Sequence, residues 1–153
     1  MKTFKSFFAF FLVSILVLSA NSCKKDGSEE LGPFIEAPVG RFKDAIDAQA
    51  GEARIVDYRS KADFDAGHIP GAINIPATVQ NTKSNNSPFC EEILNRFPDK
   101  TKPIFLYGNK SSIDLQRIVP GRVSKIGFGR SNTYVLQGGF EAWEEAGFEV
   151  VKP

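Results

Sequence analysis

Short apolar runs alternate with amphipathic segments along the chain from about residue 40 to its end. The runs are rich in β-branched and aromatic side chains and are bounded by turn-forming residues, which is typical of strands. They predict strands at residues 54–58, 73–75, 103–107 and 133–136. Between the runs, apolar residues recur at a spacing of three or four, or a helix-capping residue precedes the segment. These segments predict helices at residues 40–48, 61–66, 88–97, 112–119 and 138–146.

Strands that alternate with helices predict an α/β fold, with a parallel sheet as the middle of three layers and helices on both of its faces. Binding sites in such sheets form in the loops at the carboxyl ends of the strands, so the loop after residues 103–107 is the first candidate. Residues 148–151 are expected to add an edge strand. Pro120-Gly121 is expected to break the helix that would otherwise continue to Ile126.

Size and composition limit what the chain can be. Its 153 residues suffice for one domain with a hydrophobic core, preceded by a targeting segment. The net charge of +1 gives no basic footprint, so we expect no nucleic-acid partner. Two cysteines without a CxxC pair predict neither a disulfide framework nor a thioredoxin-like redox site. His68 has no cysteine or histidine at ligand spacing, and we expect no metal site and no cofactor.

The N-terminus has the order of a signal peptide. Lys2 and Lys5 precede an apolar run at residues 7–18, and small residues at 19–22 follow it. The run is shorter than the roughly 20 residues that a membrane-spanning helix needs, which disfavours an uncleaved anchor. We therefore expect residues 1–22 to be a signal peptide and the protein to be exported.

Cys23 directly follows those small residues and precedes a polar stretch, an arrangement that resembles a bacterial lipoprotein processing site. An ordinary cleavage after Ser22 would also leave Cys23 first. The resemblance implies that Cys23 is acylated, that membrane lipid is a partner of the protein, and that the protein is a membrane-anchored lipoprotein of the cell envelope. Residues 23–38 then form the lipidated N-terminus and a flexible tether, and residues 39–153 form the domain.

Two sequence blocks resemble the rhodanese family. The first comprises Asp57, Arg59 and Ser60 with the stretch G-H-I-P-G-A-I-N-I-P at residues 67–76. The second is V-L-Q-G-G-F-E-A-W at residues 135–143, and the similarity extends over residues 40 to 151. The resemblance implies a rhodanese-like domain. Rhodaneses transfer sulfane sulfur through a cysteine that ends a strand and opens a loop, whose amides and following helix lower the pKa of the thiol.

The resemblance puts Gly108 where the family has its nucleophile. The loop continues with Asn109, Lys110, Ser111 and Ser112, and it holds neither a thiol nor the family's usual arginine. We therefore expect no catalytic residue here and a non-catalytic binding module. A glycine, a lysine and two serines before a helix could bind a small anion at Gly108–Ser112, whereas the plainer interpretation makes the serines helix caps. A protein partner is the other expected ligand.

Cys90 is the remaining thiol of the domain, and sulfur transfer through this non-standard position is the alternative function. Its place on a predicted apolar helix face, beside Glu91 and Glu92, favours a structural role because neighbouring carboxylates disfavour a thiolate. A phosphatase would need the same missing cysteine and arginine. Asp57, Arg59 and His68 are expected to be structural, as an ion pair at a strand end and a hydrogen-bonding brace in a turn.

Overall fold

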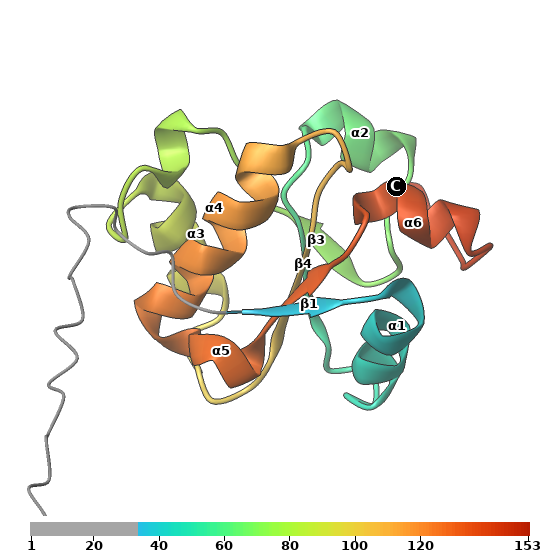
Figure 1. Ribbon diagram of the computed structural model, residues 1–153, viewed down its shortest axis with the longest axis horizontal. Helices are drawn as coiled ribbons and strands as arrows, with labels where there is room; N and C mark the ends of the chain where they lie inside the picture. The colour runs from blue at the N-terminus through green and yellow to red at the C-terminus, as the bar shows by residue number, and fades with distance from the viewer. Residues whose placement is uncertain (1–33) are drawn as a thin grey trace, which may run out of the picture.

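Residues 34–153, which the computed structural model describes, are built around a parallel sheet of five strands in the order β1-β5-β4-β2-β3 (Figure 1). The strands are β1 (Ile35–Ala37), β2 (Arg54–Asp57), β3 (Ala72–Asn74), β4 (Ile104–Tyr107) and β5 (Thr133–Leu136). The predicted α/β fold, a parallel sheet between two layers of helices, is confirmed. The predicted signal peptide, and the lipidation predicted at Cys23, lie outside the described residues.

Alternating side chains on the strands separate two hydrophobic cores, one on each face of the sheet. On β4, Ile104 and Leu106 point to one core, and Phe105 and Tyr107 point to the other. The continuous apolar run at residues 104–107 is explained by this arrangement, since both faces of the central strand are covered.

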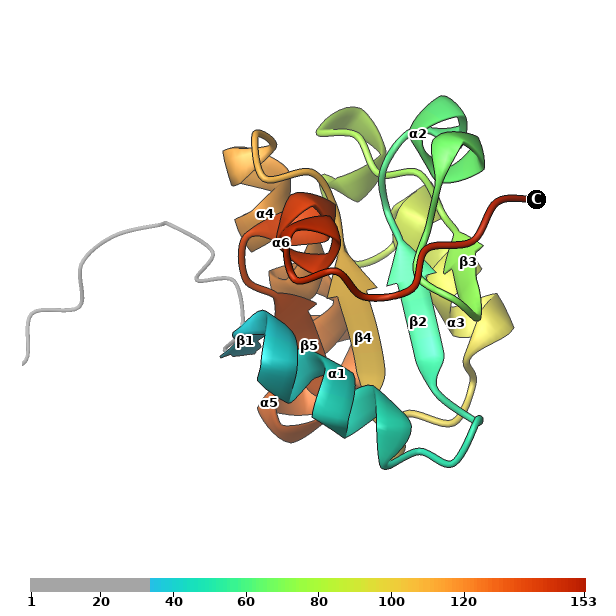
Figure 2. The same ribbon diagram turned by 90° about the vertical axis from the view of Figure 1, so that its right-hand side faces the viewer.

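Helices cover both faces, as Figure 2 shows with α1 and α6 in front of the sheet and α3 and α4 behind it. The front core joins the sheet to Phe42 of α1 (Val39–Asp47) and to Phe140 and Trp143 of α6 (Gly139–Glu145). The rear core joins it to α3 (Pro88–Arg96) and α4 (Ile113–Val123). The short helix α2 (Lys61–Ala66) begins at Ser60, whose side chain accepts a bond from the Asp63 N–H group, as its position predicted.

The expected break at Pro120 is wrong, because α4 continues through this residue to Val123. Proline inside a helix costs about 3 kcal/mol in isolation, but Val119, Pro120 and Val123 are buried, and tertiary packing offsets the local preference. The chain leaves helical geometry later, in the π-helical turn η2 (Ser124–Phe128), where Gly127 has a φ of 123°. The short α5 (Gly129–Asn132) follows and leads into β5.

Two further expectations are corrected at the edges of the domain. Part of the predicted tether is strand β1, whose Ile35 pairs in parallel register with Tyr134 of β5. Three residues between prolines are too few to give a strand signal in the sequence. They form a strand because they pair with β5. Residues 148–151 form no strand: Val151 makes a single antiparallel bridge with His68. No helix within residues 34–153 has the length and apolar character that crossing a membrane would require.

Candidate functional site

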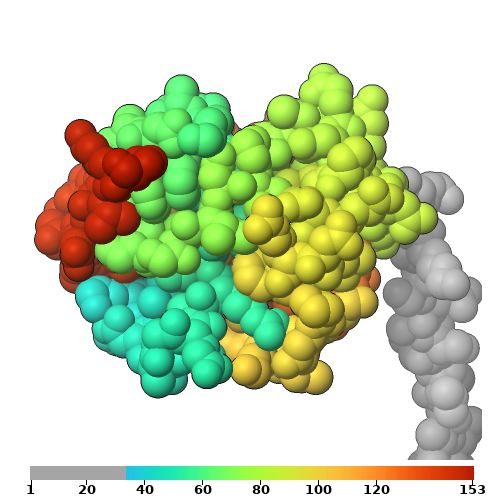
Figure 3. Space-filling view, turned by 180° about the vertical axis from the view of Figure 1, so that it is seen from behind, coloured from blue at the N-terminus to red at the C-terminus, as the bar shows by residue number. Residues whose placement is uncertain are grey.

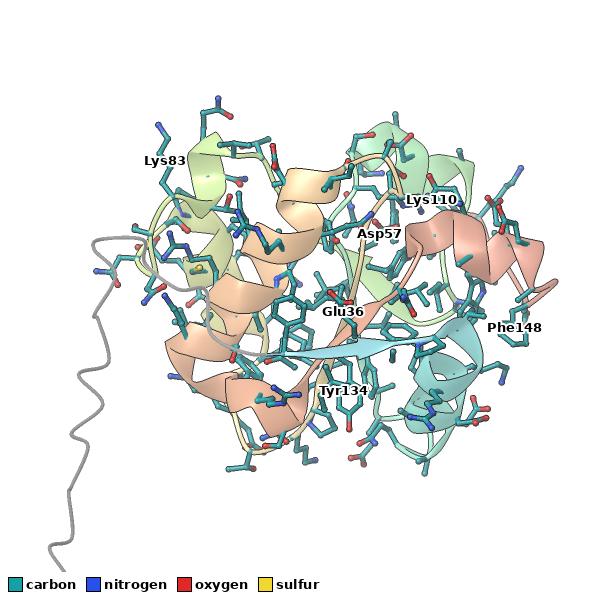
Figure 4. The ribbon with its side chains drawn as sticks, in the orientation of Figure 1. Glu36, Asp57, Lys83, Lys110, Tyr134 and Phe148 are labelled. Carbon is teal, nitrogen blue, oxygen red and sulfur yellow. The ribbon has the colours of Figure 1, made fainter. Side chains whose placement is uncertain are left out.

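The loop Gly108–Ser112 lies at the carboxyl edge of the sheet, between β4 and the start of α4. Five residues predicted as a binding site form this loop, and Asp57 and Arg59 lie beside it at the end of the neighbouring strand β2. Figure 4 shows Lys110 above Asp57 at this edge. The loop is therefore where parallel α/β sheets form their sites.

The aromatic ring of Tyr58 occupies the space that a side chain at position 108 would need. A Cβ atom on Gly108 would lie 2.6 Å from Cζ and 2.8 Å from Cδ2 of Tyr58, and closer still to Cε2. Real Cβ atoms essentially never approach other heavy atoms to less than 3.0 Å. Tyr58 is held there because its N–H group donates to the Tyr107 carbonyl at 3.0 Å, which extends the ladder between β2 and β4. Glycine is thus required at position 108.

The Tyr58 hydroxyl is buried without a hydrogen-bond partner among residues 34–153. Burial raises the pKa of this phenol well above its usual value, and the nearby Asp57 carboxylate raises it further. The ring packs with the rear core, while the hydroxyl remains unsatisfied at a cost of about 1–3 kcal/mol. Tyr58 therefore supplies no ionised nucleophile at neutral pH.

The start of α6 lies directly against the loop. The Phe140 N–H group donates to the Gly108 carbonyl at 2.8 Å. A Cβ atom on Gly139 would lie 2.6 Å from both the Gly108 oxygen and the Lys110 nitrogen, so this contact requires glycine. Gly139 also has a φ of 68°. This close approach explains Gly139, and the preceding Gly138 is the N-cap of α6 with a φ of 82°.

Side chains of this chain already bind the polar groups of the loop. The Lys110 N–H group donates to Oε2 of Glu141 at 2.9 Å. Nε2 of Gln116 donates to the carbonyls of Asn109 and Lys110, both at 2.8 Å. Ser112, at the N-cap position of α4, makes no capping bond through its side chain. Neither Glu141 nor Gln116 was predicted: Glu141 is distant from Lys110 in the sequence, and Gln116 follows the loop closely but belongs to no motif that signals a contact.

A cavity of about 260 Å³ opens beside the loop, between α2 and α6. Its wall carries three carboxylates, from Asp63, Glu141 and Glu144. A hydrogen bond from the Ser60 hydroxyl lowers the pKa of Asp63, and the Asn109 amide and the Arg59 charge act in the same direction. The cavity therefore carries an excess of negative charge at neutral pH, because Arg59 is the one basic residue among those that line it.

The guanidinium group of Arg59 is bound by residues of the fold. Its Nε and Nη2 atoms donate to the Asp57 carboxylate at 2.6–3.0 Å, and Nη2 also donates to the Gly67 carbonyl at 2.6 Å. The guanidinium lies 3.8 Å from the centre of the Phe140 ring. Burial opposes the charged form of Arg59, but the bonds to Asp57 outweigh it and raise the pKa of the guanidinium. The pair therefore ties the end of β2 to the turn at Gly67.

His68 lies in the turn after α2 and is not among the residues that line the cavity. Its ring stacks on Phe64 with centroids 3.7 Å apart, and its Nδ1 atom lies 3.0 Å from the Phe64 carbonyl oxygen. Its backbone exchanges two hydrogen bonds with Val151. Figure 3 shows the C-terminal segment against the region that contains α2. His68 thus connects this turn to the end of the chain.

Cys90 is fully buried on α3, within the rear core. Its thiol lies 3.6 Å from the Ser84 carbonyl oxygen. Burial raises the pKa of the thiol above its usual value, so the neutral form is favoured. A buried, neutral thiol is a poor nucleophile. Among residues 34–153, no three histidine, cysteine or acidic side chains gather where they could hold a metal ion.

The chain is similar to several known proteins. Residues 39–146 match the family model described as "Rhodanese-like domain". The chain is 31% identical over 111 residues to an "Adenylyltransferase and sulfurtransferase uba4" of Neosartorya fischeri, covering 61% of this chain and 22% of that protein. It is 61% identical over 28 residues to an HTH-type transcriptional regulator of Mycobacterium tuberculosis, covering 18% of this chain and 12% of the regulator. The chain thus spans a small part of either relative.

Solved structures share the fold. The Alr3790 protein of an Anabaena species matches with a TM-score of 0.57 at 20% identity, over 76% of this chain and 82% of that one. The thiosulfate sulfurtransferase of Pseudomonas aeruginosa matches with a TM-score of 0.53 at 20% identity, over 78% of this chain and 20% of that one. The 3-mercaptopyruvate sulfurtransferase of Leishmania major matches with a TM-score of 0.54 at 19% identity, over 78% and 36%.

Proposed function

This chain belongs to the rhodanese-like domain family, and from that premise we propose that it is a non-catalytic member, held at a membrane, that binds a partner through the loop edge of its sheet. Sulfur transfer in this family requires a thiolate in the loop after the central strand. Position 108, where the family resemblance puts that thiol, is glycine in this chain. No covalent sulfur intermediate can form on a residue that has no side chain.

The observation that carries the proposal is the position of the Tyr58 ring. A glycine alone would leave room for a substrate or for a thiol from elsewhere in the chain, whereas the ring fills the space above Gly108. The Tyr58 hydroxyl is neutral, because burial raises its pKa. Tyr58 and Gly108 together remove both the nucleophile and the room for one.

The names of three of these similar proteins include the word sulfurtransferase, which makes sulfur transfer the competing function. In this chain it would have to proceed through Cys90. That thiol is fully buried on α3 and favours its neutral form. Since neither access nor ionisation supports nucleophilic attack, we propose that Cys90 is a core residue.

The charges around the loop favour a protein partner over a small anion. The Lys110 N–H group already donates to the Glu141 carboxylate, which competes with any anion for this donor. The adjacent cavity is acidic and would repel an anion, but it suits a partner that presents a positive side chain. Titration with sulfate, phosphate and thiosulfate should leave the amide chemical shifts of Gly108–Ser112 unchanged. A saturable shift would make a small anion the ligand instead.

The membrane tether is proposed from the sequence of residues 1–23, through acylation of Cys23 and export to the cell envelope. Acyl chains contribute about 0.8 kcal/mol for each buried CH₂ group, so several chains on one residue hold a protein stably at a bilayer. The full chain should therefore sediment with membranes after cell lysis. The Cys23→Ser variant should be found in the soluble fraction, or retained with an uncleaved signal peptide of visibly higher mass.

Catalysis is tested by sulfur transfer from thiosulfate to cyanide, followed as thiocyanate formation. We expect no turnover above that of a heat-denatured sample, in wild type and in the Cys90→Ser variant alike. Turnover in wild type that Cys90→Ser abolishes would establish sulfurtransferase activity through the alternative thiol. Turnover that survives this substitution would also contradict the proposal, since it would require a nucleophile other than Cys90.

A further inference from the structure

We propose that the amino edge of the sheet docks on anionic lipid, so that the loop edge faces away from the bilayer. Three positively charged residues, Lys100, Lys125 and Arg130, form what we call the basic cluster at this edge. This orientation deepens the proposed function and rests on the tether that it includes, because it says which surface of the tethered domain meets the membrane.

Packing around Gly127 brings Lys100 to the segment that holds the other two residues of the basic cluster. Lys125 lies in η2 and Arg130 in α5, on either side of Gly127. The side chain of Lys100 lies over Gly127, where a Cβ atom would be 3.3 Å from its Nζ atom. Nδ2 of Asn132 donates to the Lys100 carbonyl at 3.2 Å. Lys100 thus lies over the short segment that carries Lys125 and Arg130.

The charge of this cluster is not neutralised by the ion pairs of the described residues. Two acidic residues that precede strands of the sheet are already paired, Asp99 with Arg54 and Glu52 with Lys102. None of Lys100, Lys125 and Arg130 forms an ion pair within residues 34–153. Against these three cations stands the exposed Glu36 on β1. The surface keeps a positive excess, which favours contact with anionic lipid.

The first strand after the predicted anchor begins near the basic cluster. Strand β1 begins at Ile35, which pairs with Tyr134, two residues after the end of α5. Figures 1 and 2 both show the start of β1 beside α5. The ten residues from Lys24 to Pro33 can span at most about 35 Å. The tether therefore keeps the basic cluster near the bilayer surface.

The opposite end of the domain is acidic, which fixes the orientation. Positive and negative side chains are equal in number over residues 34–153, so the basic cluster implies an excess of acid elsewhere. Acidic side chains that form no ion pair within residues 34–153 lie on α2, α6 and the turn after α6: Asp63, Glu141, Glu144, Glu145 and Glu149. Anionic lipid attracts one end and repels the other. The loop and its acidic cavity then face partners rather than lipid.

The test uses the full chain purified from membranes and reconstituted in vesicles of phosphatidylcholine, with or without about 30% phosphatidylglycerol. A fluorophore is attached at Ser131→Cys beside the basic cluster, or at Gln80→Cys at the loop edge, and is quenched by spin-labelled lipid. Cys90 is buried and does not compete for the label. We expect quenching at position 131 to rise at least about threefold with phosphatidylglycerol and to fall back in high salt, with little change at position 80.

Charge reversal supplies a matched control. The triple variant Lys100→Glu, Lys125→Glu, Arg130→Glu should lose the rise in quenching at position 131. The triple variant Lys83→Glu, Arg117→Glu, Lys152→Glu changes the net charge by the same amount at exposed positions away from the cluster. This variant should keep the rise in quenching at position 131. Equal quenching at positions 131 and 80, or equal loss in both variants, would overturn the orientation while leaving the tether intact. Failure of the chain to remain on pure phosphatidylcholine vesicles would instead refute the tether.

Discussion

The ring of Tyr58 and the backbone of Gly108 meet so closely that position 108 has no room for a side chain. The two residues directly follow the neighbouring strands β2 and β4, and the Tyr58 N–H group donates to the Tyr107 carbonyl at the end of β4. This contact is therefore set by the register of the sheet rather than by a flexible loop. In the proposed non-catalytic role, this ring fills the place where the family resemblance puts the reactive thiol.

Gly108→Ala should destabilise the domain by about 1–3 kcal/mol or more, because the new methyl group overlaps the Tyr58 ring. Combined with Tyr58→Val, the same substitution should cost at least about 1 kcal/mol less, since the smaller side chain gives the methyl group room. Urea unfolding of the two single variants and the double variant measures this coupling. Gly40→Ala is the control, because its new methyl group would have no atom within 4 Å, and it should be neutral or stabilising. Additive costs would contradict the steric explanation.

The two buried tyrosines should respond oppositely to loss of the hydroxyl. Tyr58→Phe removes an unpartnered polar group and should be neutral or stabilise by up to about 1 kcal/mol. Tyr107→Phe should cost about 1–3 kcal/mol, because its hydroxyl accepts a bond from the buried Ile69 N–H group at 3.1 Å. Thermal or urea unfolding at pH 7 compares them. A larger loss in Tyr58→Phe than in Tyr107→Phe would mean that Tyr58 has a partner.

The same tyrosines predict a loss of stability in alkali. Burial raises the pKa of both phenols above the ordinary 10.0, so the folded state keeps protons that the unfolded chain releases. Their contribution is complete below that ordinary value and is lost as the pH rises through the folded-state pKa. The free energy of unfolding should fall between about pH 9 and pH 11, and less steeply in Tyr58→Phe. An identical slope in that variant would show that Tyr58 does not contribute.

Arg59→Met should destabilise the domain by about 3–5 kcal/mol, because it leaves the fully buried Asp57 carboxylate without its partner. Lys61→Met is the matched control, since it breaks the ion pair with Asp65 on the surface, and it should change stability by less than about 1 kcal/mol. Chemical denaturation distinguishes them. Equal effects would show that burial of the Asp57–Arg59 pair is not what makes it important.

Glu141→Ala should loosen the loop without unfolding the domain. The substitution removes the acceptor of the Lys110 N–H group, a bond of about 1 kcal/mol, so exchange of this amide should accelerate about fivefold. Glu144→Ala removes another carboxylate from the same helix and cavity and should leave this exchange rate unchanged. The comparison is made by hydrogen exchange with NMR detection. Equal acceleration in both variants would point to general loss of cavity charge.

The sequence predicted the elements whose signals are local. Strands β4 and β5 and helix α2 follow from apolar runs and from Ser60 as a cap, and all three formed where expected. Strand β1 was not predicted because its three residues become a strand only by pairing with β5, about one hundred residues later. The expectation at Pro120 failed for a similar reason, since buried packing outweighs its local preference.

The site was predicted in outline but not in its contacts. The loop after residues 103–107 was predicted at the carboxyl edge of the sheet and lies there, whereas the place of Gly108 at the family's thiol position stays a prediction from the resemblance. The overlap with Tyr58 and the bond from Lys110 to Glu141 join residues that are distant along the chain. The sequence offered one signal of the contact between Tyr58 and Gly108. A bulky tyrosine lies between Asp57 and Arg59, and the chain has its smallest residue at position 108. Only the register of β2 against β4 shows that the large side chain of Tyr58 lies where Gly108 has none.

The intact mass of the full chain after incubation with excess thiosulfate most directly tests whether this domain can carry sulfur. With the ring of Tyr58 over Gly108 and Cys90 buried, the mass should stay unchanged, with and without prior reduction. A gain equal to one sulfur atom that dithiothreitol reverses would contradict the proposal. Peptide mapping of that product would then show which residue carries the persulfide.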